Sequence, residues 1–346
     1  MSKKITYLLG AGASFHSCPI WSEQGAKMID LAKSVHPKAT FAETEKNTYP
    51  NDLAGMFWSM GYHGIKANEF NTIDTYAKKL YLNESWNQLN DLKTSVSLFF
   101  TIWQSIDEKK IKIYDQNTNR FKVIDQRYIS LLATCLEKNS NNSRPKLNDN
   151  VRFVTWNYDL QLEAAYKLFC KDIEWGNIDK GLSFIPDENN STKDLCVCHL
   201  NGFHGYYGTG KSFNHILDVT EGLSLSKIMG AIEFVPTSVK NKQISFAPYI
   251  NYAWEKDSPL AKIAREQARK ILTVTDILII IGYSFPSFNR EIDKDLFNSC
   301  KNRVQRIIFQ DPNGSAEYLS EAFDIDKKKI EIITDNMHQF ILPSVF

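Results

Sequence analysis

The sequence predicts an α/β fold in which a Rossmann-like, doubly wound, mainly parallel sheet carries an inserted helical module. Three observations support this fold class: short apolar runs of strand length, turn residues that bound them, and helical patterns between them. Such runs are typical of strands that are buried on both faces of a parallel sheet. Six runs qualify, at residues 5–9, 151–155, 195–200, 277–281, 306–309 and 330–334.

The clearest helical pattern precedes the run at 277–281. Ser258 and Pro259 stand where a capping serine and a first-turn proline favour the start of a helix. Apolar residues then recur at helical spacing from Leu260 to Leu272. Strands that alternate with helices of this kind predict a doubly wound sheet.

We expect a single domain over residues 1–346, with a helical insert at about 45–148. The insert is aromatic and mostly helical in pattern, and the polar stretch 139–145 closes it. Residues from about 201 to 257 carry many glycines, aromatics and polar side chains. That composition indicates irregular loops over a site.

Composition is that of an ordinary globular protein. The 346 residues include 41 basic and 40 acidic side chains, for a net charge of +1. Proteins that bind phosphate backbones usually carry a basic excess, so nucleic acid is not an expected partner. The apolar run at 277–282 is far shorter than the ~20 residues that cross a bilayer, and the first residues lack a signal-peptide pattern. We therefore expect a cytoplasmic protein without membrane contact.

The six cysteines are scattered and form no C-x-x-C pair. Structural zinc sites and thioredoxin-like motifs usually contain such pairs. We therefore expect no zinc and no other bound metal. Reduced cysteines buried in the core of a cytosolic protein are the simpler interpretation.

The first candidate binding motif is the glycine-rich turn at 10–14, directly after the first apolar run. Glycines there let the backbone approach a pyrophosphate, whose charge the N-terminus of a following helix favours. Phe15 stands where the dehydrogenase fingerprint needs glycine, so an ordinary strand-to-helix turn is the alternative. The candidate cofactor-binding residues of this turn are Gly10, Ala11, Gly12 and Ser14.

Two more motifs stand at the ends of predicted strands. Asn157 and Asp159 follow the run at 151–155, and His199 is the last residue but one of the run at 195–200. Ligands of open α/β sheets lie at the carboxyl ends of the strands, so Asn157 is placed where a substrate would lie. His199 is placed to act as a general base near neutral pH. Structural roles are the alternatives: Asn157 or Asp159 caps the next helix, and the histidine only forms hydrogen bonds.

The last two strand ends also carry candidate binding residues. Gly282 and Ser284 follow the most apolar run, where a backbone N–H and a hydroxyl can bind a ribose or a phosphate. Asp311 follows the run at 306–309, where a carboxylate can hold an adenosine ribose. A plain turn is the alternative at both places.

The order of these motifs resembles that of the sirtuin-like family. Gly-Ala-Gly-Ala-Ser, Thr-Trp-Asn-Tyr-Asp, His-Leu-Asn-Gly and Gly-Tyr-Ser-Phe cover the predicted sheet domain but not the helical insert. More narrowly, the chain is similar to the bacterial anti-phage branch, whose members hydrolyse NAD. The resemblance implies NAD as substrate and Asn157 and His199 as catalytic residues. It also places Asp74, in the segment Phe70–Tyr76, near the cofactor.

Two departures from the family pattern keep other functions open. The chain lacks the four-cysteine zinc module of deacylating sirtuins, which favours NAD hydrolysis over NAD-dependent protein deacylation. The family's catalytic histidine stands directly before glycine, where this chain has Asn201. We assign the catalytic role to His199, two residues earlier; Asn201 is the alternative at the usual histidine position, and His204 is a further candidate. Asn201 is also a candidate cofactor-binding residue. A sensor that binds NAD or an ADP-ribose-type nucleotide without turnover is the third function.

The resemblance also implies control of the activity. A freely active NAD hydrolase would be toxic to its own cell, so we expect an inactive resting state that homo-oligomer formation or a partner releases. Related systems pair such a chain with a ring-forming ATPase of the HerA type, and this chain has no P-loop of its own. The sequence does not separate hydrolysis to ADP-ribose from cyclisation.

Overall fold

The chain divides into two compact units. The sheet unit comprises residues 1–14, 124–202 and 251–346, and the helical unit comprises residues 15–123 and 203–250. The structure is a computed structural model, and it describes residues 3–49, 53–105, 124–139, 144–170, 175–190, 192–209, 212–215, 248–255 and 258–342.

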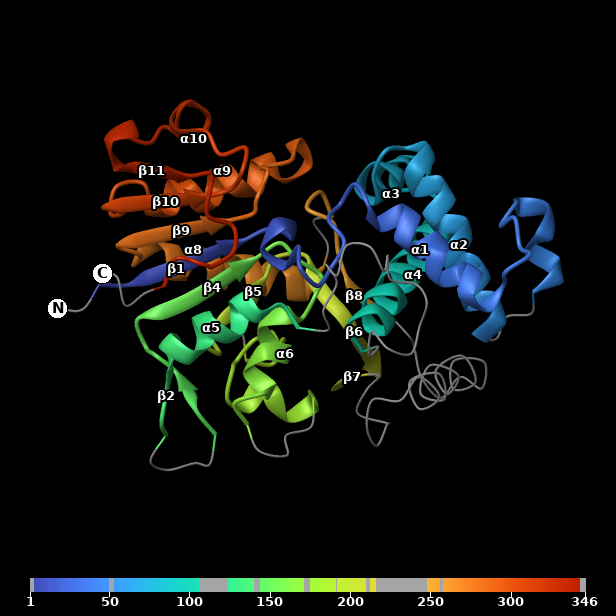
Figure 1. The fold of residues 1–346 in the computed structure, drawn as a ribbon, viewed down its shortest axis with the longest axis horizontal. Helices are drawn as coiled ribbons and strands as arrows, with labels where there is room; N and C mark the ends of the chain where they lie inside the picture. Colours follow the sequence, from blue (N-terminus) through green and yellow to red (C-terminus); the bar gives the residue numbers. More distant parts are fainter. Residues whose placement is uncertain are drawn as a thin grey trace. The chain divides into compact units, whose positions relative to one another are not determined.

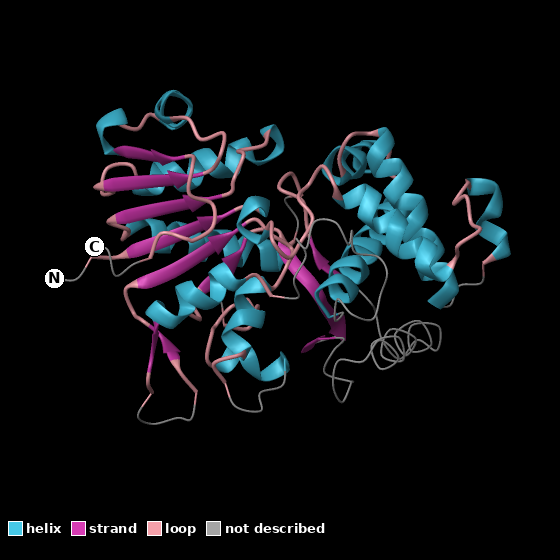
Figure 2. Cartoon of the chain, viewed as in Figure 1, coloured by secondary structure: helices cyan, strands magenta, loops and turns pink. Residues whose placement is uncertain are grey.

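The sheet unit is built on six parallel strands (Figures 1 and 2). Every neighbouring pair runs parallel, in the order β11-β10-β9-β1-β4-β5. The predicted α/β fold class and all six predicted strands are confirmed, although the run at 195–200 forms only a three-residue strand. The strands are β1 (Ile5–Leu9), β4 (Val151–Thr155), β5 (Val197–His199), β9 (Ile277–Ile281), β10 (Arg306–Gln310) and β11 (Ile330–Ile333).

The strand order places a topological switch point between β1 and β9. From β1 the chain builds outward through β4 to β5, then returns to the other side of β1 and builds outward again through β9, β10 and β11. Sheets of this kind bind ligands beyond the carboxyl ends of the strands, at the switch point. We call that side of the sheet the carboxyl edge and the opposite side the amino edge.

Helices cover both faces of the sheet in Figure 1. One face packs against α8 (Pro259–Thr273), α9 (Arg290–Cys300) and α10 (Ala316–Phe323). The other face carries α5 (Gln126–Cys135) and α6 (Gln161–Lys167). The core of the first face contains Leu8, Val154, Leu278 and Ile280 from the strands and Leu272, Phe297 and Phe323 from the helices.

The predicted start of α8 is confirmed in detail. Ser258 is the N-cap residue, its side chain accepts a hydrogen bond from the N–H of Ala261, and Pro259 opens the first turn. This capping satisfies an N–H group that has no partner within the helix. The strand β9 begins four residues after the helix ends, which fixes the register of the most apolar strand.

The helical unit contains α1 (Gln24–Val35), α2 (Leu53–Glu69), α3 (Ile73–Leu82) and α4 (Trp86–Ser105). A three-stranded sheet accompanies them in the order β7-β6-β8. Its strands are β6 (Gly202–Thr209), β7 (Ser212–His215) and β8 (Pro248–Ile250). None of the helices in the described residues combines the length and the apolar composition that a membrane-spanning helix requires.

The boundaries of the helical unit differ from the predicted insert at 45–148. The unit begins at Phe15, thirty residues earlier, and takes a second segment, 203–250, from later in the chain. The polar stretch 139–145, of which 140–143 lie outside the described residues, does not close it, because the strands before and after it, β2 (Leu136–Glu137) and β3 (Lys146–Leu147), pair antiparallel within the sheet unit. Within 201–257 the described residues form strands rather than only loops; 210–211, 216–247 and 256–257 lie outside the described residues.

Candidate active site at the carboxyl edge of the sheet

The glycine-rich turn after β1 lies against the turn after β9, at the topological switch point. The N–H of Gly12 donates to the carbonyl of Gly282 at 2.9 Å, and the N–H of Gly10 donates to the carbonyl of Ile281 at 3.0 Å. A Cβ atom at Gly12 would stand 2.8 Å from the Cα of Gly282, and Gly282 itself has a φ of +58°. These glycines are therefore required by a backbone-to-backbone contact, whatever the turn binds.

The turn does not lead into the α-helix that the sequence predicts as a phosphate partner. Ala11–Ser14 form a 3-10 helix of four residues, and the first α-helix begins only at Gln24, in the helical unit. Residues 15–23 separate this turn from α1 in the chain. The favourable dipole of a long helix N-terminus is therefore absent directly behind this turn within the described residues.

Ser14 is the centre of a buried hydrogen-bond network. Its hydroxyl donates to the Oδ1 of Asp159 at 2.9 Å, receives the Nδ2 amide of Asn157 at 3.3 Å and lies 3.1 Å from the hydroxyl of Tyr128 on α5. A serine hydroxyl offers one donor and two acceptor positions, so these three contacts use its full capacity. The side chain is fully buried, so it organises the site rather than facing a ligand.

Asn157 connects the end of β4 to the glycine turn. Its Nδ2 donates to the carbonyl of Gly10 at 2.9 Å, and its own N–H donates to the Oγ1 of Thr155 at 3.0 Å. Both amide hydrogens are thereby directed at Gly10 and Ser14. The amide oxygen Oδ1 receives no hydrogen bond from the residues that the structure describes, so it remains available as an acceptor.

Asp159 has the structural role that its position suggests. Its Oδ1 accepts the N–H of Gln161, the first residue of α6, at 3.2 Å, as well as the hydroxyl of Ser14. The N-cap residue of α6 is Leu160 rather than Asp159, but the carboxyl joins the first residue of the helix to the glycine turn. Burial raises its pKa to about 6, and the hydrogen bonds from Ser14 and Gln161 oppose that rise.

His199 lies at the end of β5 and has both ring nitrogens engaged. Its Nε2 lies 2.8 Å from the Oε1 of Glu163 on α6, and its Nδ1 lies 3.2 Å from the main-chain carbonyl of Asn157. The histidine is 2% exposed and Glu163 is fully buried. The structure thus brings the two predicted catalytic residues together, but the imidazole contacts the main chain of Asn157. Its nitrogens do not face open space.

Glu163 was missed by the sequence analysis. It lies in the first turn of the short helix α6, where a glutamate is an ordinary surface residue. A carboxylate and an imidazole that are both buried require each other as partners. The two are 36 residues apart in the chain, and only the parallel pairing of β4 with β5 brings them together.

Asn201, at the position that the family pattern gives to histidine, is held by Arg265 of α8. The Oδ1 of Asn201 lies 3.4 Å from a guanidinium nitrogen of Arg265, which also donates to the carbonyl of Tyr252 at 3.2 Å. The Nε of Arg265 donates to the carbonyl of Leu200 at 3.2 Å. Arg265 is buried and was not predicted; its contacts fix the chain directly after β5.

Arg127 of α5 supports the glycine turn from the other side. Its Nη2 donates to the carbonyl of Ala13 at 3.0 Å and lies 3.5 Å from that of Gly12. The same guanidinium forms a buried ion pair with Asp125 at 2.6 Å. Because Asp125 balances the charge, we assign Arg127 to the support of the turn rather than to phosphate binding.

A strap of residues 335–342 is fastened to the sheet unit by its main-chain carbonyls. Arg127 donates to the carbonyl of Met337 at 3.1 Å, and the hydroxyl of Tyr7 donates to that of Ile341 at 2.7 Å. The side-chain amide of Gln310, at the end of β10, donates to the carbonyls of Asn336 and Gln339. One guanidinium therefore joins the strap to the glycine turn.

The two residues predicted to hold the adenosine end have different surroundings. Ser284 is exposed beyond Gly282, at the carboxyl end of β9. Asp311 is half-buried after β10, and its Oδ1 accepts the N–H of Asn313 at 2.8 Å. Burial raises the pKa of Asp311. Both lie at the carboxyl edge, but Asp311 already stabilises its own turn.

Two predicted site residues, Asp74 and His204, belong to the helical unit. Asp74 lies in the first turn of α3 behind the N-cap residue Thr72, and burial raises its pKa to about 6. His204 is buried on β6, with Nδ1 3.0 Å from the hydroxyl of Thr101 and Nε2 against Gln104.

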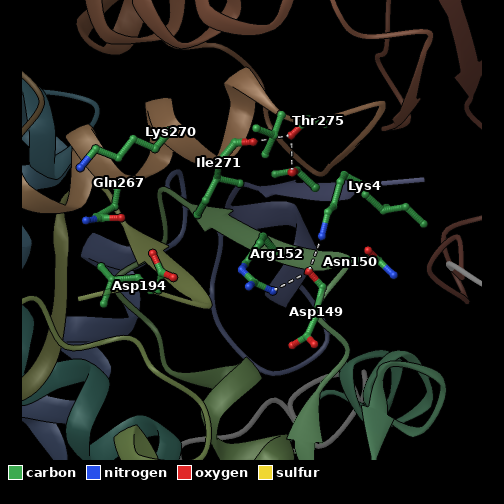
Figure 3. A pocket seen from close by; sticks show the side chains of 13 residues that line it. Lys4, Asp149, Asn150, Arg152, Asp194, Gln267, Lys270, Ile271 and Thr275 are labelled. Atoms are coloured by element: carbon green, nitrogen blue, oxygen red, sulfur yellow. Dashed lines mark hydrogen bonds between the residues drawn. The ribbon is translucent and has the colours of Figure 1, made fainter. Parts of the chain in front are cut away.

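A hollow in the sheet unit lies at the amino edge, at the opposite end of the strands from the groups at the carboxyl edge. It has a volume of about 180 Å³. Figure 3 shows Lys4 and Arg152 both directed at the main-chain oxygen of Asp149, at 3.1 and 3.3 Å. Asp194 and Lys270 line it as exposed side chains. The hollow contains none of the predicted site residues.

The six cysteines are free thiols. Burial raises the pKa of Cys135 and of Cys300 to about 12, so these thiols are protonated at neutral pH. The described residues contain no group of three or more histidine, cysteine or acidic side chains arranged to hold a metal ion.

Comparison with known proteins does not indicate a function for this chain. No protein-family model matches the chain, and no curated protein matches it at a significant level. The features that bear on function are therefore the parallel sheet, its switch point and the groups at the carboxyl edge.

Proposed function

We propose that the chain is an NAD hydrolase that cleaves the nicotinamide–ribose bond at the carboxyl edge of the sheet. The observation that carries the proposal is the placement of Asn157. Its amide hydrogens are bound to the glycine turn at the switch point, and its Oδ1 is left as an acceptor. A dinucleotide in such a sheet lies across this point, which brings its ribose beside the tips of the central strands.

The chemistry needs little from the protein beyond orientation and an acceptor. The C1–nitrogen bond of the ribose breaks, nicotinamide leaves as a neutral molecule with the bonding electrons, and the ribose passes through a cation-like state. Water then adds to C1 and loses a proton. The Oδ1 of Asn157 would accept a hydrogen bond from a ribose hydroxyl or from that water. Interactions of this kind act through positioning at the reacting carbon.

In this proposal His199 and Glu163 act as a hydrogen-bonded pair. The pair would hold the main chain of Asn157, because the imidazole contacts that carbonyl at 3.2 Å. Should His199 act as the general base, as the family resemblance implies, Glu163 would orient the ring and stabilise its protonated form. The Gly10–Ser14 turn would face the pyrophosphate, and Ser284 and Asp311 would lie toward the adenosine end.

One observation favours a second candidate, a sensor that binds NAD or an ADP-ribose-type nucleotide without turnover. Asn201 takes the place of the family's histidine and is held by Arg265. His199 is enclosed by Glu163 and Asn157. A sensor would bind ADP-ribose in calorimetry yet release no nicotinamide from NAD.

The expected control of the enzyme also belongs to this proposal. Anti-phage defence by NAD depletion requires an inactive resting state, and a homo-oligomer or a HerA-type ATPase partner would release it. The chain carries no P-loop, so an ATPase activity would come from a separate protein.

Nicotinamide release from NAD is the direct test, with the purified protein and with cells that express it before and after phage challenge. We expect Asn157→Ala to lower the rate by ~10²-fold or more, the order found when one group that stabilises a transition state is removed. Asn150→Ala is the matched control, since it removes an amide at the amino edge of the same strand region. Wild-type protein that consumes no NAD in either setting would refute the proposal, and so would Asn157→Ala with full activity.

A further inference from the structure

A second buried network lies at the carboxyl edge, on the face of the sheet that α8 and α9 cover. Asp293 of α9 is fully buried, and both of its carboxylate oxygens accept hydrogen bonds. The indole Nε1 of Trp156 donates to Oδ1 at 3.2 Å, and the hydroxyl of Tyr283 donates to Oδ2 at 2.8 Å. The amide of Asn289 donates to the same tyrosine hydroxyl at 2.9 Å.

The two donors of this network are the chain neighbours of site residues. Trp156 directly precedes Asn157, and Tyr283 directly follows Gly282. Their rings stack at 6.0 Å with an interplanar angle of 18°. A Cβ atom at Gly10 would stand 2.6 Å from the Cα of Tyr283, so the glycine turn lies directly on this tyrosine. One carboxylate therefore joins the turn after β4 to the turn after β9, across β1.

Burying the carboxyl group of Asp293 costs free energy that an apolar residue would not cost, so its presence on α9 indicates a specific role. Burial raises the pKa of Asp293 to about 8, while hydrogen bonds from Tyr283 and Trp156 and the charge of Arg290 lower it. A leucine at 293 would complete the apolar stripe that Leu296, Phe297 and Cys300 form on α9, and burying an apolar side chain there would cost far less. A carboxyl group can hold both the indole and the phenol in one fixed geometry: ionised, it accepts from both, and protonated, it accepts from the indole and shares its proton with the phenol oxygen.

We propose that Asp293 is a positioning residue for Asn157. By holding Trp156 and Tyr283, it keeps the turns after β4 and β9 against the glycine turn, so that the amide of Asn157 faces the substrate. This inference rests on the proposed function, and it adds a residue that acts through others. On the opposite face the Ser14 and Glu163 networks hold the same asparagine, so Asn157 is fixed from both faces of the sheet.

The test compares Asp293→Asn and Tyr283→Phe with Thr275→Val. Asp293→Asn places an NH₂ group against one of the two donors, and Tyr283→Phe removes one donor while keeping the stacked ring. Thr275→Val removes a buried hydrogen bond of 2.7 Å to Thr6 at the amino edge, at the other end of the same β9 strand. It is therefore a control for a loss of stability alone.

Two measurements read the variants: kcat and KM for nicotinamide release, and amide hydrogen exchange of peptides that cover 8–14, 156–160 and 282–286. We expect Asp293→Asn and Tyr283→Phe to lower kcat by about 10- to 100-fold with little change in KM, since displacement of a reacting group costs this much. Exchange should rise in those peptides. Thr275→Val should change neither quantity at the carboxyl edge.

The proposal is overturned if Asp293→Asn and Tyr283→Phe keep the wild-type kcat, or if exchange at the three peptides does not change. It is also overturned if Thr275→Val lowers kcat equally, because the effect would then be general loss of stability. Wild-type protein that releases no nicotinamide would be a failure of the proposed function instead. The exchange measurement still decides in that case whether Asp293 holds the two turns.

Discussion

The two edges of the six-stranded sheet are made by the same strands, yet the polar groups of the candidate site and the charged groups around the amino-edge hollow differ in burial. At the carboxyl edge Ser14, Asn157, Glu163, His199 and Asp293 are all buried, and each has hydrogen-bond partners within the protein. At the amino edge the charged groups around the hollow lie in water or are only half-buried.

This difference in burial favours the carboxyl edge as the candidate site. Exposed charges are hydrated and contribute little to either stability or geometry. Polar groups withdrawn from water cost free energy unless they are paired, so their presence indicates a geometry that the fold maintains. The hollow of about 180 Å³ lies at the amino edge, whereas the candidate site at the carboxyl edge consists of buried, hydrogen-bonded polar groups.

Beyond Asn157 itself, the largest effect should come from breaking the His199–Glu163 pair. We expect His199→Ala and Glu163→Gln each to lower the rate of nicotinamide release by about 10²-fold, since either change frees the main chain of Asn157. The double variant should be no worse than the more severe single variant, because residues that act as a unit are not additive. Steady-state kinetics of the three proteins check this.

Two outcomes would contradict that interpretation. An active Glu163→Gln beside an inactive His199→Ala would show that the imidazole works without its carboxylate partner. A loss on Asn201→Ala but not on His199→Ala would move the role to Asn201, at the family's usual histidine position. Either result leaves the proposed site at the carboxyl edge and changes only which residue is assigned the role of His199.

A smaller effect is expected on the pH dependence of stability. Asp293 has a folded-state pKa of about 8 against 3.8 for the free group, so the folded state retains its proton to higher pH. The free energy of unfolding should therefore fall as pH rises, by on the order of 2 to 4 kcal/mol between about pH 5 and about pH 8. Urea unfolding at several pH values measures it.

Asp293→Asn should flatten this fall, because an amide does not titrate. A residual slope of the same sign should remain below about pH 6 from Asp159 and Asp74, whose pKa values burial also raises. An unchanged slope in the variant would show that Asp293 is ionised throughout the range, held so by Tyr283, Trp156 and Arg290.

The smallest effect should follow from Ser14→Ala. This change leaves the Nδ2 of Asn157, the hydroxyl of Tyr128 and the carboxyl of Asp159 each with one partner fewer. We expect a loss of about 1–3 kcal/mol in the free energy of unfolding, the cost of unsatisfied buried groups. Lys270→Ala, exposed at the amino edge, should change it by less than about 0.5 kcal/mol. Equal effects of the two variants would remove the contrast between the edges.

The strands could be predicted because a strand buried in a parallel sheet appears in the sequence as a short apolar run. This pattern can be recognised without knowing which strand it pairs with. The candidate residues at their ends followed from the rule that parallel strands end at one edge. The residues that hold those candidates could not be predicted in the same way. Glu163, Arg127 and Arg265 lie in helices as ordinary polar residues, and their partners are fixed only by strand order.

Asp293 is the exception, because the sequence does carry a signal for it. It lies on the same helical stripe as Leu296, Phe297 and Cys300, so a charge falls on an otherwise apolar face. The boundaries of the helical unit had no comparable signal. Composition marks a helical segment, but it does not reveal that residues 15–44 and 203–250 pack with it while 124–148 return to the sheet.

The strap at 335–342 has a consequence for divergence among related chains. Four of its carbonyls, at Asn336, Met337, Gln339 and Ile341, receive the hydrogen bonds that fasten it, and every amino acid has a carbonyl. Substitutions in the strap therefore leave these bonds intact, whereas the donors Tyr7, Arg127 and Gln310 cannot be exchanged freely. We expect related chains to keep the donors Tyr7, Arg127 and Gln310 while the sequence of the strap diverges. A sequence alignment would then show no similarity in the strap, although its main chain is held in the same way.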